Sequence, residues 1–200
     1  MIRVNFTEKY RRIWDAALPF LEKGRPGDDT HAAAVAKMIM DYDGSLGFDK
    51  DVLVPAAILH DIGHAAIMPE HFKFITGSEK LENGKLVHML AGAKIAHDIL
   101  SKIGYETDKT VEIVEIVSMH DADQLKGLDI SSVYNTDNKK VFHDIDSLDR
   151  YNDARLFASK NLFKDQGQMI GLLEKMLDNF YYDEFRQIAK NFIEKKVNIQ

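Results

Sequence analysis

The chain has 200 residues, of which 45% are hydrophobic and 29% are charged, and its formal net charge is −6. This composition is typical of a soluble globular protein that is long enough to bury one core. It excludes a general nucleic-acid binder, because such a protein needs a basic patch and the densest basic run is only Lys9 to Arg12.

Helical periodicity runs through most of the sequence, and strand-like alternation is almost missing. We therefore predict an all-α fold, a single-domain helical bundle over residues 1–200. Thr7 is expected to cap the first helix and Pro19 to kink it. The expected helices cover residues 7–24, 31–43, 50–62, 84–103, 108–120, 139–160 and 168–195. Irregular segments are expected at residues 24–30, 44–47, 68–83 and 127–138, where glycine, proline and small polar residues gather.

The third expected helix is apolar nearly all the way round and ends at the pair His60-Asp61. Such a helix is expected to be buried, and a buried carboxylate is costly unless it is paired or bound to a cation. A divalent metal held by both side chains would remove that cost. Taken alone, however, the pair is explained equally well by a buried hydrogen bond.

Three more histidines, His31, His88 and His120, fall among apolar residues at helical spacing. Each by itself is more often a satisfied core residue than a metal ligand. At the end of its helix, His120 fits either a protonated ring that favours the helix dipole or a neutral ligand. Gly92, one turn after His88, would allow another backbone to approach closely.

Near the C-terminus the segment 143–150 has three acidic residues, Asp144, Asp146 and Asp149. Asp144 and Asp146 point to nearly opposite helix faces. Asp146 could pair with Arg150 one turn later, or it could share a cation with Asp149.

Together these residues resemble the HD-domain phosphohydrolase superfamily, whose pattern is a histidine, a His-Asp pair and a distant aspartate. The segment Leu59-His60-Asp61-Ile62-Gly63-His64 is similar to the core motif, and residues 144–149 are similar to the terminal Asp-x-Asp-x-x-Asp element. Residues 88–93 are similar to the intermediate His-x-x-x-Gly-Ala element. The resemblance covers residues 31–155 and implies an HD-type metal-binding core.

The resemblance implies a ligand set of His31, His60, Asp61 and Asp146 for one ion. A subset of the family adds two histidines and binds two metals, and His88 and His120 occupy those positions. In this binuclear arrangement Asp61 bridges the two ions, which would be drawn from Mn, Fe, Co, Mg or Ni. The alternative is a single ion, with His88 contacting substrate phosphate instead.

The implied activity is hydrolysis of a phosphoester in a small, anionic, nucleotide-like substrate. Asp61, His64 and His88 are the expected catalytic residues, with His64 or His88 stabilising charge or moving a proton. Lys94, Arg150 and Arg155 are candidates for binding phosphate, among which the sequence does not choose.

Two other functions fit the same residues. A few HD-type proteins are di-iron oxygenases, and a helical regulatory module with a vestigial site would need no metal at all. We expect a cytoplasmic protein, because cysteine, a signal peptide and a membrane-spanning run are all missing from the sequence. We expect neither stable nucleic-acid binding nor membrane contact, and a homo-oligomer is compatible with the sequence.

Overall fold

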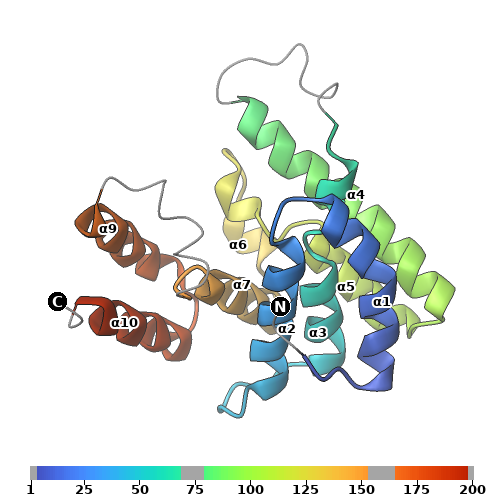
Figure 1. Cartoon of the computed structure of the whole chain (residues 1–200), viewed down its shortest axis with the longest axis horizontal. Helices are drawn as coiled ribbons and strands as arrows, with labels where there is room; N and C mark the ends of the chain where they lie inside the picture. The colour runs from blue at the N-terminus through green and yellow to red at the C-terminus, as the bar shows by residue number, and fades with distance from the viewer. Residues whose placement is uncertain (1–3, 69–78, 153–164, 198–200) are drawn as a thin grey trace. The chain divides into compact units, whose positions relative to one another are not determined.

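A computed structural model describes residues 4–68, 79–152 and 165–197 (Figure 1). All regular structure in these residues is helical, which confirms the predicted all-α class. The chain divides into two compact units, Met1–Lys139 and Lys140–Gln200, and each is described here by itself. The expectation of a single domain over residues 1–200 stays a prediction.

The first unit contains most of the helices. They are α1 (Glu8–Lys23), α2 (Asp28–Asp41), α3 (Lys50–Leu59), the 3₁₀ helix η1 (Ile62–Ala66), α4 (Glu79–Ile103), α5 (Thr107–Val117), the 3₁₀ helix η3 (Ala122–Gln124) and α6 (Ile130–Val133). Helix α7 (Asp137–Asp149) starts in this unit and continues into the second. The second unit further contains α9 (Gln166–Met176), the 3₁₀ helix η5 (Leu177–Asn179) and α10 (Asp183–Val197).

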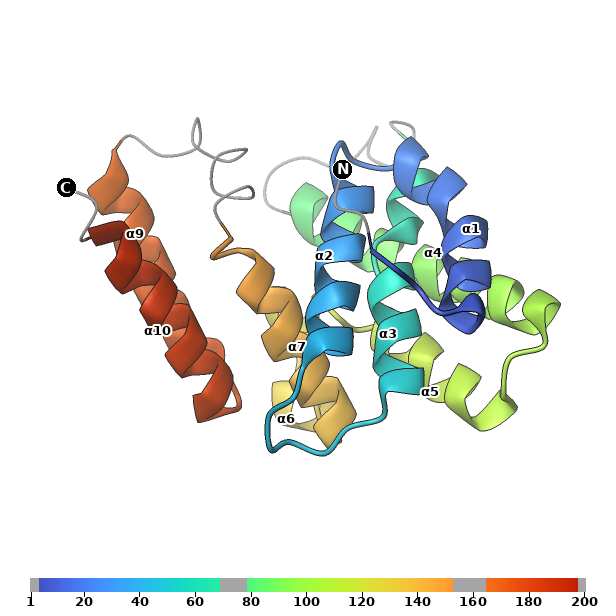
Figure 2. The same cartoon turned by 60° about the horizontal axis from the view of Figure 1, so that its bottom comes forward.

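Helix α3 is the centre of the first unit. Every residue from Val52 to Leu59 is buried, as the apolar sequence predicts. Its N-terminus is capped by Asp49, whose side chain accepts the backbone N–H of Asp51. Helices α2 and α5 pack against it, and Figure 2 shows α2 and α3 side by side. The buried helix therefore delivers its C-terminal residues into the interior.

Several predicted boundaries differ from the structure. Helix α1 continues through Pro19, α2 begins three residues earlier than expected, and α4 already begins at Glu79 within a segment predicted to be irregular. Helix α5 ends at Val117, so His120 lies in the turn after the helix rather than at its last residue. The insertion at residues 127–138 contains the short helix α6.

The predicted helix over residues 168–195 is wrong, because the chain leaves helical geometry between α9 and α10. The buried carboxylate of Asp144 accepts the backbone N–H groups of Tyr181 and Tyr182, at 3.0 and 2.8 Å. Arg186 donates to the carbonyl oxygens of Leu177 and Phe180. These tertiary bonds take up the backbone groups that a continuous helix would use, and no glycine or proline marks the break in the sequence.

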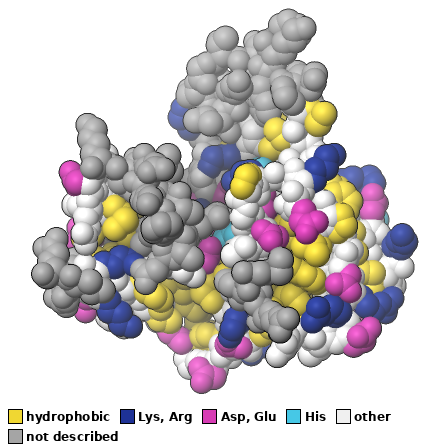
Figure 3. Space-filling view, viewed as in Figure 1, with side chains coloured by type: hydrophobic (Ala, Val, Ile, Leu, Met, Phe, Trp, Pro, Cys, Tyr) yellow, Lys and Arg dark blue, Asp and Glu magenta, His cyan; other side chains and the backbone are white. Residues whose placement is uncertain are grey.

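The surface agrees with the composition. Figure 3 shows acidic and basic side chains interspersed over the described part of the face in view, with no basic patch there. Within the described residues, none of the helices combines the length and apolarity that crossing a bilayer requires.

A polar cluster ties together the ends of α1, α3 and α5. The Asp51 carboxylate accepts a hydrogen bond from Tyr10 at 2.8 Å and lies 3.0 Å from Lys9 Nζ and 3.1 Å from Lys109 Nζ. The Tyr105 hydroxyl donates to the Asp51 carbonyl oxygen at 2.7 Å. Burial raises the pKa of Asp51, but the bonds from Tyr10 and the two lysines outweigh it and lower the pKa to about 2.

Replacing Asp51 with alanine is expected to lower the free energy of unfolding by about 1–2 kcal/mol, since Tyr10 loses its acceptor and Lys9 and Lys109 each lose one of their acidic partners. The estimate is modest because the Asp51 side chain is 35% exposed to solvent. A carboxyl group with a lowered folded-state pKa stabilises above its unfolded value and loses that contribution as pH falls towards about 2. The difference between wild type and Asp51→Ala in urea unfolding should therefore shrink below about pH 4.

The matched control is Asp98→Ala, which removes an aspartate from the exposed pair with Lys94 on α4 and should change stability little. Equal stability of Asp51→Ala and Asp98→Ala at pH 7 would contradict a stabilising role for the cluster.

Candidate metal centre

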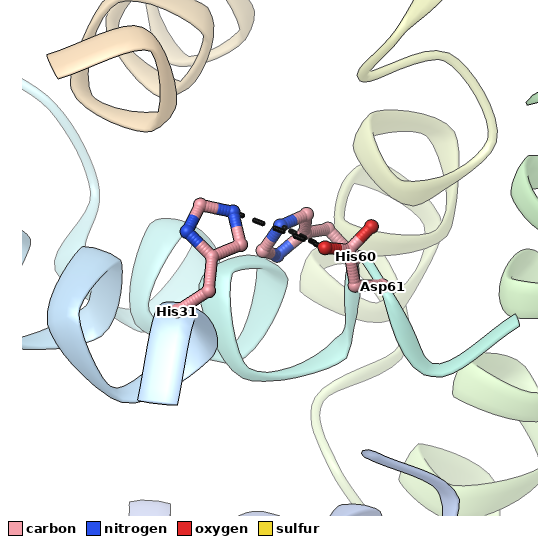
Figure 4. Close-up of side chains that lie close together, drawn as sticks. All are labelled: His31, His60 and Asp61. Carbon is pink, nitrogen blue, oxygen red and sulfur yellow. Dashed lines mark ion pairs between the residues drawn. The ribbon is translucent and has the colours of Figure 1, made fainter. Parts of the chain in front are cut away.

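The first unit gathers five histidines around the carboxylate of Asp61. They come from different elements: His31 from α2, His60 from the end of α3, His64 from η1, His88 from α4 and His120 from the turn after α5. Figure 4 shows His31 and His60 directed towards Asp61 from two neighbouring helices. Residues far apart in the sequence thus converge on one buried acidic side chain, which is 3% exposed.

The two carboxylate oxygens of Asp61 face different histidines. Oδ2 lies 3.4 Å from His60 Nε2 and 3.9 Å from His31 Nε2. Oδ1 lies 3.6 Å from His120 Nε2 and 3.9 Å from His88 Nε2. Two groups of donor atoms spaced for a metal ion, His31–His60–Asp61 and Asp61–His88–His120, therefore share one carboxylate.

Backbone carbonyl groups fix the orientation of three of these rings. His60 Nδ1 donates to Ala57 O and His120 Nδ1 to Val117 O, each at 2.9 Å, and His88 Nδ1 donates to Gly84 O at 3.3 Å. A carbonyl oxygen only accepts hydrogen bonds, so each Nδ1 has the proton. In a neutral ring Nε2 then presents a lone pair, which is the arrangement that metal-binding histidines use.

These lone pairs face one another and the carboxylate. His88 Nε2 and His120 Nε2 are only 3.1 Å apart, and both neighbour Asp61 Oδ1. Acceptor atoms packed this closely in a buried space repel each other unless a cation or a proton lies among them. Ligand bonds of about 2.0–2.2 Å bring two donors on one ion to within about 4.2 Å of each other. The donor set, its spacing and its tautomers all fit a bound divalent metal.

The electrostatics of the cluster favour a neutral His88 and an ionised Asp61. Burial, together with the neighbouring His120 and His64, lowers the pKa of His88 to about 2. Burial by itself raises the pKa of Asp61, but the facing imidazoles of His60, His120 and His64 outweigh this and hold it well below its usual range. A neutral His88 and a charged Asp61 are the forms that bind metal.

Two glycines allow the histidines to converge. A side-chain carbon on Gly63 would overlap the carbonyl oxygen of His88 and the backbone nitrogen of Gly92. Gly92 in turn lies against Gly63 and the His60 carbonyl oxygen, as the close approach predicted from its position requires. The backbones of η1 and α4 touch at this point, so His60, Asp61 and His64 reach His88.

His64 lies at the edge of the same cluster. Its Nε2 atom is 3.3 Å from Asp61 Oδ1, and its ring stacks on His88 with centroids 4.1 Å apart.

The turn that holds His120 is fixed by Tyr134, whose hydroxyl donates to the His120 carbonyl oxygen at 3.0 Å. Tyr134 comes from the segment that the sequence suggested was irregular.

Sequence reasoning missed three charged residues at this site. Arg25 donates from Nη2 to Asp61 Oδ2 at 2.8 Å and from Nε to Asp28 at 3.2 Å. Burial lowers the pKa of Arg25, but Asp61, Asp28 and Asp121 outweigh it and raise the pKa. The Asp121 carboxylate lies 3.7 Å from His88 Nε2. One signal was present: His120-Asp121 is a second His-Asp pair.

The remaining expected ligand, Asp146, lies buried on α7 in the second unit, and its assignment stays a prediction. Asp144, two residues earlier, is bound by its own unit: it accepts from Tyr181, Tyr182 and the ring of His143. Asp144 therefore serves as a buried acceptor within its own unit.

The other histidines behave differently from the cluster. His143 is buried and structural, and His97 is exposed. His71 and Arg155, the latter a candidate for binding phosphate, lie outside the described residues. Lys94 pairs with Asp98 on an exposed face of α4.

A family model described as the HD domain matches residues 28–151, more than half of the chain and close to the predicted core of 31–155. No curated protein and no solved structure matches the chain.

Replacing Gly63 with alanine is expected to lower the free energy of unfolding by about 3 kcal/mol or more, because the new methyl group meets backbone atoms that cannot move aside. Urea unfolding followed by circular dichroism measures the change. Gly47→Ala is the matched control, since open space surrounds that position. Equal stability of the two variants would show that η1 and α4 are not in backbone contact.

Replacing Asp144 with alanine is expected to destabilise the second unit by about 2–4 kcal/mol, because the backbone N–H groups of Tyr181 and Tyr182 lose a buried, charged acceptor. The exposed Asp178 of the same unit serves as control. A protein with unchanged unfolding but less bound metal would instead make Asp144 the ligand in place of Asp146.

Proposed function

The chain belongs to the HD-domain family, and from this premise we propose that it is a metal-dependent phosphohydrolase. Members of this family are generally hydrolases of this kind. The observation that supports the proposal most strongly is the sharing of Asp61 by two groups of histidine nitrogens.

We propose a site for two ions, with Asp61 as the bridging ligand. His31, His60 and Asp146 complete the ligands of one ion, and His88 and His120 complete those of the other. The orientation of the Asp61 oxygens supports this division, since Oδ2 faces the first pair of histidines and Oδ1 the second. Elemental analysis of the purified protein would identify the ions among Mn, Fe, Co, Mg and Ni.

Divalent ions at such a site lower the pKa of a bound water and neutralise the charge of phosphoryl oxygens. The residues of the chain orient the ligand atoms and stabilise charge or move a proton. Backbone carbonyls hold His60, His88 and His120 in the tautomer that leaves Nε2 free for an ion. His64 Nε2 faces the same Asp61 oxygen as His88 and His120, so His64 is the residue we assign to stabilising charge or moving a proton.

The substrate we propose is a phosphoester of a small, nucleotide-like molecule. A net charge of −6 does not oppose an anionic substrate, because bound cations reverse the local field. The segments at residues 68–83 and 127–138 are expected to shape specificity, as loops on a rigid scaffold usually do.

A di-iron oxygenase is the second candidate. The observation that favours it is the nitrogen-rich donor set, because imidazole ligands suit iron as well as other transition metals. The two candidates separate by experiment: an oxygenase consumes oxygen and shows an iron charge-transfer band, whereas a phosphohydrolase releases phosphate without oxygen.

Metal content of purified variants tests the ligand assignment. We expect two ions per wild-type chain after loading with Mn, about one in His31→Ala and in His120→Ala, and none in Asp61→Ala, since only Asp61 belongs to both groups. Elemental analysis gives the count, and circular dichroism confirms that the variants remain helical. The control is His97→Ala, whose exposed ring is outside the cluster.

A screen of nucleotide phosphoesters with Mn, Co, Mg and Ni tests the activity. We expect phosphate release by wild type and His97→Ala, and a loss of at least about a hundredfold in Asp61→Ala, because the bridging ligand is gone. Wild-type protein that retains no metal and releases no phosphate with any of these ions would overturn the proposal.

A further inference from the structure

Arg25 lies at the metal centre but has no place in the ligand set. It follows α1 in the turn that leads into α2, and its guanidinium group spans two buried carboxylates, Asp28 and Asp61. The Arg25 backbone N–H also donates to Asp28 Oδ2 at 2.8 Å, so one residue, Asp28, holds both the backbone and the side chain of Arg25.

A glycine in the turn between α1 and α2 allows the contact between Arg25 and Asp28. A side-chain carbon on Gly24 would come within 2.8 Å of Asp28 Oδ2 and 3.2 Å of His64 Cβ. Gly24 therefore lets the turn lie directly on Asp28 and His64. Asp28 is 1% exposed and its position is fixed by the bonds that it accepts from Arg25.

By spacing alone, Asp28, Asp61 and His64 form a third group that could hold a metal ion. The guanidinium group already lies between the two carboxylates of this group, with Nη2 2.8 Å from Asp61 and Nε 3.2 Å from Asp28. The Arg25 guanidinium group thus takes the position that a metal ion bound to Asp28, Asp61 and His64 would need. The metal ions are left with the two groups that share Asp61 with the other histidines.

The guanidinium group keeps further donors. An arginine has five N–H donors in a planar fork, and the bonds of the Arg25 side chain to Asp28 and Asp61 use Nε and Nη2. Its side chain is 51% exposed, in contrast to the buried carboxylates that hold it. One edge of the group is therefore anchored while the rest can meet a molecule from solvent.

We propose that Arg25, held by Asp28, binds the phosphoryl group of the substrate beside the metal ions. Planar guanidinium groups match phosphate oxygens in geometry and charge, and a group fixed before binding loses little entropy when it binds. This inference rests on the proposed phosphohydrolase function and adds the residue that recognises the phosphoryl oxygens. Lys94, paired with Asp98 on an exposed helix face, has no such anchor.

The alternative is that Arg25 only balances the charge of Asp61. The two roles predict different properties for a variant that lacks the Arg25 side chain. If Arg25 only balances charge, the metal content of the variant changes and its phosphate affinity changes with it. If Arg25 binds phosphate, the phosphate affinity falls while the metal content stays the same.

The test measures binding of inorganic phosphate to the Mn-loaded full chain by isothermal titration calorimetry, together with metal content. For Arg25→Ala we expect a loss of phosphate affinity of about ten- to a hundredfold with the ions retained. Arg25→Lys should regain only part of the affinity, because it restores charge without the fork. Arg11→Ala, which removes an exposed arginine of α1, is the matched control and should bind like wild type.

Unchanged phosphate affinity in Arg25→Ala overturns the proposal, and so does a fall that metal loss fully accounts for. Failure of the proposed function looks different. Wild-type protein that binds phosphate through Arg25 but hydrolyses no phosphoester would contradict the hydrolase and leave the binding role standing. Hydrolysis with the same kcat/KM in wild type and Arg25→Ala would leave the hydrolase and remove Arg25 from it.

Discussion

The structure of the first unit depends on how one buried carboxylate is neutralised. Asp61 lies at the end of an apolar helix and faces the Nε2 atoms of His60, His88 and His120. The Nδ1 atoms of these three rings donate to backbone carbonyls on the other side. In their neutral form these rings offer lone pairs rather than protons to the shared space, and the Arg25 guanidinium donates to Asp61 Oδ2. A cation among the donors would relieve this repulsion, and metal binding would then also stabilise the interior.

The ends of the helices and the contacts between them position the side chains of this centre, and the lengths of the helices matter less. Helix α3 stops at Leu59, and the chain tightens into η1, which turns His60, Asp61 and His64 towards the same space. Gly63 and Gly92 then allow the backbones of η1 and α4 to meet. The Asp51 cluster holds the opposite ends of α1, α3 and α5, away from the chemistry. Scaffold and site thus use the same buried helix at its two ends.

Sequence reasoning predicted the helical class and most of the helices, because periodicity and apolar faces report burial. It also selected the five histidines that gather around Asp61: His31, His60, His88 and His120 as polar residues on apolar helix faces, and His64 from the resemblance to the HD-domain family. It failed where a tertiary bond decides the outcome: Asp144 breaks the helix expected over residues 168–195 by accepting two backbone N–H groups. It also missed Arg25 and Asp28, because their meeting with Asp61 depends on how a turn lies on the interior.

The central claim is that Asp61 is shared between two cation sites. Anomalous X-ray diffraction from crystals of the Mn-loaded protein tests it most directly. The account predicts two anomalous peaks that flank the Asp61 carboxylate, one beside Oδ2 with His31 and His60 and one beside Oδ1 with His88 and His120. A map with no peak at this carboxylate, or with ions bound only elsewhere, would contradict the account.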